Sequence, residues 1–179
     1  MAGQPADYLE EHLPYEMSML EHTYRRMHRT DIEPDWNAFM ESFCIHARNL
    51  KMFVTNDTGV NNSCVIARDF VKFDCKVPSN LTGAFQRINE QIAHLTKRRV
   101  VNPTDKFDID DARNVHGWLI PAMQKFIAAL DEDGRKRWDS AAKEKRRLKV
   151  ASERPTRTGT IRIVTSTSVT TDQIFRIVP

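Results

Sequence analysis

Apolar residues recur at every third or fourth position through most of the chain, which is the period of one face of an α-helix. The clearest case predicts a central helix over residues 36–54, whose apolar face is Trp36, Phe39, Phe43, Ala47, Leu50 and Val54. Ile45, Met52 and Phe53 lie off that face, so little of the circumference is polar. A helix that is apolar nearly all round is typically buried.

The same period predicts three more helices, over residues 14–28, over residues 80–99, and from Asp108 or Asp110 to about residue 130. Short connections favour antiparallel neighbours, so we expect the first two helices to form a hairpin, with Asp35 as N-cap of the central helix. Pro121 should kink the last helix. Its predicted apolar stripe is Ala112, Val115, Leu119, Met123, Phe126 and Leu130.

Turn residues over 56–63 should end the central helix, and a shorter helical or irregular piece should follow over about 65–73. Beyond residue 134 the pattern predicts a short basic helix, and then two short strands or an extended arm rich in β-branched residues. The fold prediction is therefore all-α. It consists of an antiparallel bundle of four to five helices in residues 1–134, with a basic, β-prone tail in residues 135–179.

The charge is unevenly distributed, although the net charge of the 179 residues is only +3. Residues 135–179 hold 12 Lys and Arg against 4 Asp and Glu, whereas residues 1–134 hold 15 against 20. A basic segment can attract nucleic acid, and an indole ring within it can stack on a base. A charged, solvated terminal helix is the other interpretation. The candidate nucleic-acid-binding residues are Arg135, Lys136, Arg137, Trp138, Lys143, Lys145, Arg146 and Arg147.

The three cysteines are too few, and odd in number, for a disulfide scaffold, so we interpret them as reduced thiols of a cytoplasmic protein. No export signal and no apolar run long enough to cross a membrane is apparent. The carboxylates between residues 105 and 111 lack calcium-loop spacing, and the cysteines lack zinc spacing. We therefore expect neither a metal site nor a cofactor.

The most informative polar pattern is a stripe on the predicted third helix, formed by Arg87, Gln91, His94 and Arg98. Guanidinium groups bind phosphate oxygens as a fork, and imidazole transfers protons near neutral pH, so the stripe suits a phosphate-bearing substrate. A solvated helix face, or a histidine hydrogen-bonded inside the bundle, explains the same pattern without function.

In one interpretation, His46, Arg48 and Asn49 on the central helix face the third helix and complete a site with His94. The alternative is that they tie two helices together through buried hydrogen bonds. Arg113 and His116 also share a helix face, which a solvated first turn explains equally well.

Two segments carry a family resemblance, Glu41-Ser-Phe-Cys-Ile-His-Ala-Arg-Asn-Leu50 and Arg87-Ile-Asn-Glu-Gln-Ile-Ala-His-Leu-Thr96. They resemble a group of uncharacterised bacterial helical-bundle proteins and, more distantly, the HEPN superfamily. The HEPN motif is an Arg followed by four to six residues and a His, which Arg87 and His94 satisfy. Active members commonly have a polar residue after the Arg, where this chain has Ile88.

The resemblance implies a helical bundle, often dimeric, that acts as a toxin or defence ribonuclease. It implies that His94 transfers a proton on the ribose 2′-OH or the leaving oxygen, and that Arg87 stabilises charge on the phosphate. The first functional hypothesis is therefore a homodimeric, metal-independent ribonuclease or RNA-binding protein. The alternative is a non-catalytic interaction module that oligomerises or binds a partner through its C-terminal arm.

Overall fold

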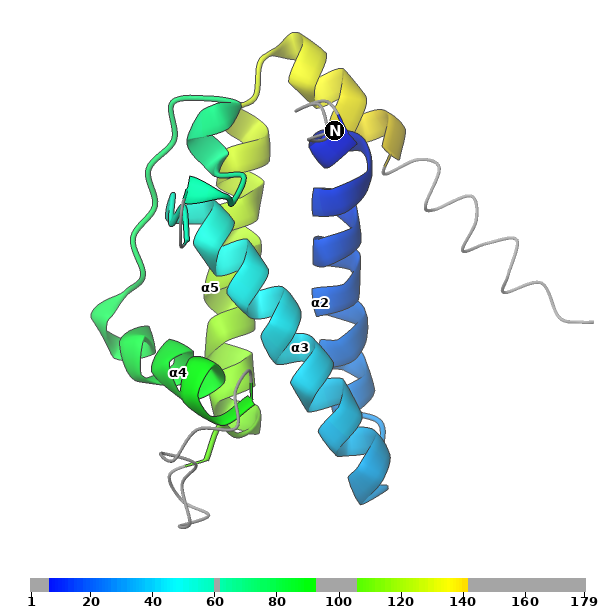
Figure 1. The fold of residues 1–179 in the computed structure, drawn as a ribbon. Coiled ribbons are helices and arrows are strands. Elements are labelled where there is room, and N and C mark those ends of the chain that lie inside the picture. The colour runs from blue at the N-terminus through cyan, green and yellow to red at the C-terminus, as the bar shows by residue number, and fades with distance from the viewer. Residues whose placement is uncertain (1–6, 60–61, 93–105, 142–179) are drawn as a thin grey trace, which may run out of the picture.

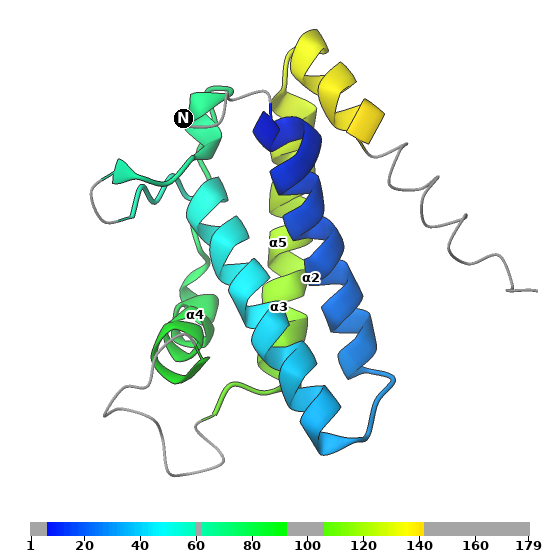
Figure 2. The same cartoon turned by 45° about the vertical axis from the view of Figure 1, so that its right-hand side comes forward.

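Three long helices form the frame of the molecule: α2 (Leu13–Met27), α3 (Glu33–Val54) and α5 (Ile109–Ala129). A computed structural model describes residues 7–59, 62–92 and 106–141. α2 and α3 run antiparallel as the predicted hairpin, and α5 packs against both (Figure 1, Figure 2). The described part of the chain is all-α, as the apolar spacing predicts, and contains no strand.

The helix ends follow from local sequence. α2 continues directly from a π-helical turn, η1 (Tyr8–His12), and Pro14, which has no N–H to donate to that turn, is the second residue of α2. α3 begins at Glu33, earlier than the Asp35 cap predicts, because Pro34 also fits a first turn. Asp108 caps α5, and its carboxylate accepts hydrogen bonds from the backbone N–H groups of Asp110 and Asp111, both at 2.9 Å.

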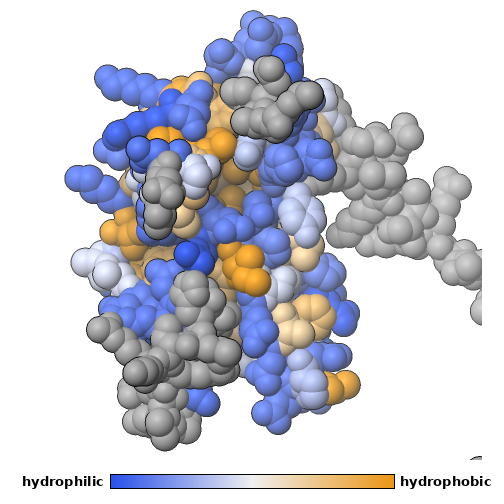
Figure 3. All heavy atoms as spheres, viewed as in Figure 1, coloured by the Kyte–Doolittle hydropathy of each residue, from blue (hydrophilic) through white to orange (hydrophobic). Residues whose placement is uncertain are grey.

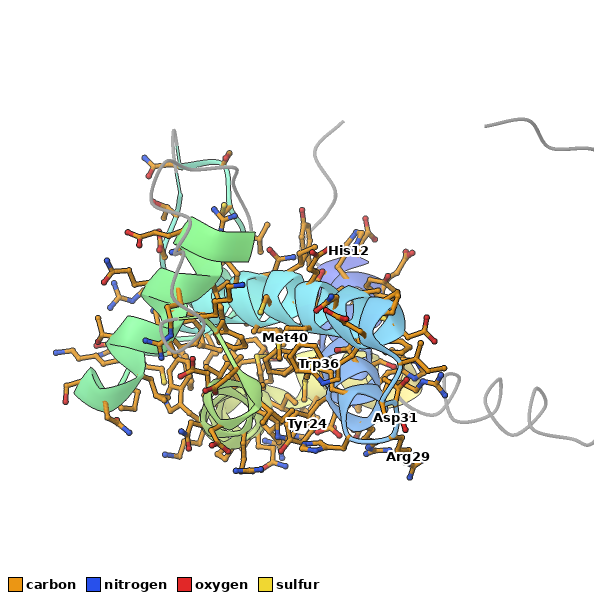
Figure 4. All side chains as sticks on the ribbon, turned by 90° about the horizontal axis from the view of Figure 1, so that it is seen from below. His12, Tyr24, Arg29, Asp31, Trp36 and Met40 are labelled. Carbon is orange, nitrogen blue, oxygen red and sulfur yellow. The ribbon has the colours of Figure 1, made fainter. Side chains whose placement is uncertain are left out.

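The core lies where the three long helices meet. Every residue of the predicted α5 stripe is buried, and so are the predicted positions from Phe43 onward on the α3 face. Viewed from below, Met40 lies among the helices, whereas Arg29 and Asp31 project outward from the turn between α2 and α3 (Figure 4). α3 is less enclosed than its composition predicts, since Ile45 is 52% exposed.

The predicted third helix is shorter and less regular in its described part. It consists of a 3₁₀ turn, η4 (Ser79–Leu81), then α4 (Thr82–Arg87), then a π-helical turn, η5 (Ile88–Ile92). The apolar side chains of Leu81, Phe85 and Ile88 in this segment are buried. The remainder of this predicted helix, from residue 93 onward, lies outside the described residues.

Between α3 and η4 the chain is mostly irregular, with one 3₁₀ turn, η3 (Ala67–Asp69), and it passes beside α5 (Figure 1). Its aromatic side chains Phe70 and Phe73 surround Phe126 of α5, and Phe53 of α3 completes the cluster. These four rings join three parts of the chain that are distant in sequence.

A last helix covers residues 132–141 at the top of the bundle in Figure 1. It corresponds to the start of the predicted basic helix. Trp138 is 9% exposed and packs in the core, and Arg137 bonds Glu10 at 2.9 Å, so this helix is fixed to the first turns of the chain. The predicted β-prone segments lie outside the described residues.

Candidate functional site

A pocket of about 500 Å³ lies between the C-terminal half of α3, the loop that follows it, and the α4–η5 segment. We call it the Arg48 pocket. Arg48 and Lys51 come from α3, Asp57 comes from the loop, and Asn89 comes from η5. The other residues of its wall are Met52, Gly59, Ser63, Cys64 and Phe85.

The loop that follows α3 contains three residues with left-handed backbone conformations, Asn56, Gly59 and Asn62. Asn56 has φ 58°, and its side-chain amide donates to the Phe73 carbonyl (3.0 Å) and accepts from the Arg68 N–H (2.9 Å). Gly59 has φ 65°, and a Cβ at that position would lie 2.8 Å from Cys64 Sγ. Within the described residues, the predicted turn begins at Asn56, and Asp57, Gly59 and Ser63 line one side of the Arg48 pocket.

The electrostatics of this pocket are cationic. Lys51 Nζ bonds Asp57 Oδ2 at 2.9 Å. This bond holds the pKa of the Asp57 carboxyl below its usual range, together with the backbone N–H of Gly59 and, more weakly, the charge of Arg48. Arg48 is half-buried and forms no hydrogen bond or ion pair with any other described residue. The pocket therefore presents a positive charge that its described wall does not neutralise.

A second pocket, of about 310 Å³, lies between α2 and α3, and we call it the Glu16 pocket. His46 Nδ1 donates to Glu16 Oε2 at 2.7 Å, and Asn49 Nδ2 lies 3.3 Å from both carboxylate oxygens. His46 is 8% exposed, and the Tyr15 ring contacts it edge-on. His46 and Asn49 thus join α2 to α3, His46 from a buried position and Asn49 from an exposed one.

Among the described members of the predicted site, His46 and Asn49 have different surroundings from Arg48. Arg48 lies in its own pocket, whereas His46 and Asn49 bind Glu16. Gln91 belongs to η5, and only its backbone is described. His94 and Arg98 lie outside the described residues.

Arg87 makes a forked ion pair with Asp111 of α5. Its Nε lies 2.9 Å from Oδ2, and its Nη2 lies 2.5 Å from Oδ1. The Asp111 side chain is 15% exposed and the Arg87 side chain 34%. This ion pair joins α4 to the first turn of α5, so one edge of the guanidinium is already bound to a carboxylate.

A double-mutant cycle will measure how much this pair stabilises the fold. We expect Arg87→Gln and Asp111→Asn each to lower the free energy of unfolding by about 1–2 kcal/mol, because each leaves a half-buried partner unpaired. The double variant should lose about 1 kcal/mol less free energy of unfolding than the sum of the losses of the two single variants. Urea unfolding followed by circular dichroism measures each value. The exposed Arg113–Asp110 pair is the matched control, with a coupling below about 0.5 kcal/mol; equal couplings for the two pairs would contradict this role.

His116 of α5 also bonds a glutamate of α2, as His46 does. His116 Nε2 bonds Glu21 Oε1 at 2.9 Å, and its ring stacks on Tyr24 with centroids 4.1 Å apart. Arg113, its predicted companion, is exposed and pairs with Asp110 instead. Sequence reasoning missed both acidic partners, Glu16 and Glu21. Their sequence signal was weak, because an acid on a helix surface is ordinary.

The described basic residues of the last helix have protein partners. Arg135 donates to the carbonyls of Ala128 and Leu130 at the end of α5, and Lys136 pairs with Glu132. Little of the Trp138 ring is accessible to stack on a base. Lys143, Lys145, Arg146 and Arg147 lie outside the described residues.

The three cysteines are free thiols, and burial raises the pKa of Cys44 far above its usual value. Within residues 7–59, 62–92 and 106–141, no cluster of three or more His, Cys, Asp or Glu side chains is arranged to hold a metal ion. Among the described helices, none is both long and apolar enough to cross a membrane.

No family model, no curated protein and no solved structure matches this chain.

Proposed function

We propose that this protein binds single-stranded RNA and that the Arg48 pocket holds one of its phosphates. The observation that carries the proposal is Arg48, a half-buried residue that forms no ion pair with any described carboxylate. A guanidinium binds phosphate oxygens with strong, charge-assisted hydrogen bonds. The carboxylate in the pocket wall belongs to Asp57 and is already bound by Lys51.

The position of this charge supports an anionic ligand. Residues 1–134 carry more acidic than basic side chains, so a cationic pocket there is a local exception. Concave walls of low dielectric focus the field of such a charge and raise the local concentration of anions. A phosphate bound there would also interact favourably with the neighbouring Lys51.

We further propose that His94 performs metal-independent cleavage of the bound RNA, as the HEPN resemblance implies. His94 follows η5, whose Asn89 lines the Arg48 pocket. Its imidazole removes the proton of a ribose 2′-OH, and the 2′-oxygen forms a bond to phosphorus. The bond from phosphorus to the 5′-oxygen breaks, and the 5′-oxygen takes up the proton, which leaves a 2′,3′-cyclic phosphate. Arg48 replaces Arg87 as the group that stabilises phosphate charge, because Arg87 is bound to Asp111.

The test uses the full chain, its His94→Ala variant and end-labelled single-stranded RNA in EDTA. We expect the wild type to bind and cleave, and His94→Ala to bind with unchanged affinity but not to cleave. Affinity should fall as salt rises, because each phosphate contact contributes about −0.7 to the slope of log K against log salt. Binding without cleavage by either protein would reject the catalytic step alone. Absence of binding would reject the whole proposal, with circular dichroism confirming that both proteins are folded.

A second candidate function is a non-catalytic interaction module. It is favoured by exposed apolar side chains on the α2–α3 side of the bundle, since Tyr15 is 49% and Ile45 52% exposed. Figure 3 shows apolar surface on α3 bordered by hydrophilic residues. A chain that forms a homodimer by sedimentation, loses it in Ile45→Lys and binds no RNA would establish this function instead.

A further inference from the structure

The Glu16 pocket combines a small volume with apolar and aromatic walls. Its volume of about 310 Å³ is at the lower end for small-molecule sites. Leu13, Leu50 and Phe53 form apolar wall, while the rings of Tyr8 and His12 lie 4.8 Å apart within the same lining. Nucleobases stack on such rings, and apolar walls suit their faces.

Two polar groups of this pocket, the Glu16 carboxylate and the Asn49 amide, contact each other, and we call them the acid–amide row; Tyr8, His12 and Ser63 also line the pocket. His46 holds Glu16 with a short bond of 2.7 Å from inside the bundle. The contacts from Asn49 are longer, 3.3 Å to each oxygen, so the donors of a ligand can replace them. The Glu16 side chain is 21% exposed and lines the pocket, so its carboxylate can be reached by a ligand.

Guanine is the nucleobase whose edge matches this row. Its N1–H and N2–H are two adjacent donors for a carboxylate, and its O6 beside them is an acceptor for an amide N–H. Adenine would place the acceptor N1 against the carboxylate, and uracil would offer one donor flanked by two acceptors. Asn49, once released from Glu16, supplies the donor for O6.

The two pockets share three residues of their walls, Met52, Ser63 and Cys64. A ligand with a base in one pocket therefore has the other pocket beside it for its phosphate. We propose that this protein recognises a guanine nucleotide of single-stranded RNA, with the base on Glu16 and Asn49 and an adjoining phosphate on Arg48. This inference rests on the proposed RNA-binding function, and it assigns the substrate class of the same site.

The test compares three labelled five-nucleotide RNAs, with guanine, adenine or inosine between flanking uridines, by fluorescence anisotropy with the full chain in EDTA. If cleavage occurs, the same RNAs carry 2′-O-methyl sugars, which block the 2′-oxygen as a nucleophile. We expect the guanine RNA to bind about tenfold more tightly than the adenine RNA. Inosine, which lacks the N2 amino group, should be intermediate. Glu16→Gln should bind the guanine RNA only as tightly as the wild type binds the adenine RNA.

A second variant separates stacking from base recognition. Tyr8→Ala should weaken binding of all three RNAs by a similar factor, several-fold, and keep their order. If Glu16→Gln fails to fold, the order of affinities for the three RNAs in the wild type and in Tyr8→Ala tests the guanine inference instead. Equal wild-type affinity for all three RNAs would overturn the guanine inference and leave RNA binding established. If none of the three binds, the proposed function fails as well.

Discussion

Phe126→Ala is expected to lower the free energy of unfolding by about 3–5 kcal/mol, the largest loss of any single substitution considered for this protein. Phe126 is completely buried, and its ring makes edge-on contacts with Phe53 at 4.8 Å and Phe73 at 5.7 Å between centroids. Its removal leaves a cavity where α5, α3 and the irregular segment meet. The remaining rings cannot close this cavity without moving the backbone.

Urea unfolding of the purified variant measures this loss. A domain of this kind is stable by only about 5–15 kcal/mol, so the variant should be visibly less stable at room temperature. Gln124→Ala is the matched control, because it lies on the same helix but is exposed, and it should change the free energy by less than about 0.5 kcal/mol. Equal, small effects for both variants would show that the aromatic cluster does not join these segments.

Glu16→Ala should cost about 1–3 kcal/mol of stability, although Glu16 is a polar residue on the side of a helix. Its carboxylate is the partner of His46, which is 8% exposed, and of Asn49. Without it, the His46 ring nitrogen is left buried and without its hydrogen-bond partner, which costs more than the bond itself contributes.

Thermal and urea unfolding of three variants distinguish this role from a general charge effect. Glu11→Ala removes the same charge from an exposed position on the preceding turn and should be nearly neutral. Glu16→Gln keeps an acceptor for His46 and should recover at least half of the loss. If Glu16→Ala is as stable as Glu11→Ala, the α2–α3 hairpin is held by its apolar contacts alone.

The apolar pattern was sufficient to predict the helices and much of the core. The α5 stripe is buried at every predicted position, and Asp108 caps its helix, because both features depend only on neighbours along the chain. The segment from η4 to η5 shows what apolar spacing does not predict. Its apolar residues Leu81, Phe85 and Ile88 are buried, but the segment contains a 3₁₀ turn and a π-helical turn, and spacing alone does not specify the type of helix.

The grouping of polar residues could be predicted only in part. His46 and Asn49 are three residues apart and share a helix face, whereas Arg48 is two residues from His46 and points elsewhere, as helical geometry requires. The sequence was sufficient to place Arg48 on a different helix face from His46 and Asn49. It was not sufficient to predict the acidic partners of the two histidines, because Glu16 is distant from His46 in the chain and Glu21 is still more distant from His116.

The central claim is that Arg48 binds a phosphate of RNA, and the most direct test compares Arg48→Gln with Arg113→Gln. Both variants lose one positive charge, but Arg113 is exposed and paired with Asp110. With labelled single-stranded RNA at fixed salt, we predict that Arg48→Gln binds about tenfold more weakly and that Arg113→Gln binds like the wild type. Equal affinities for the two variants, with both folded by circular dichroism, would contradict the claim.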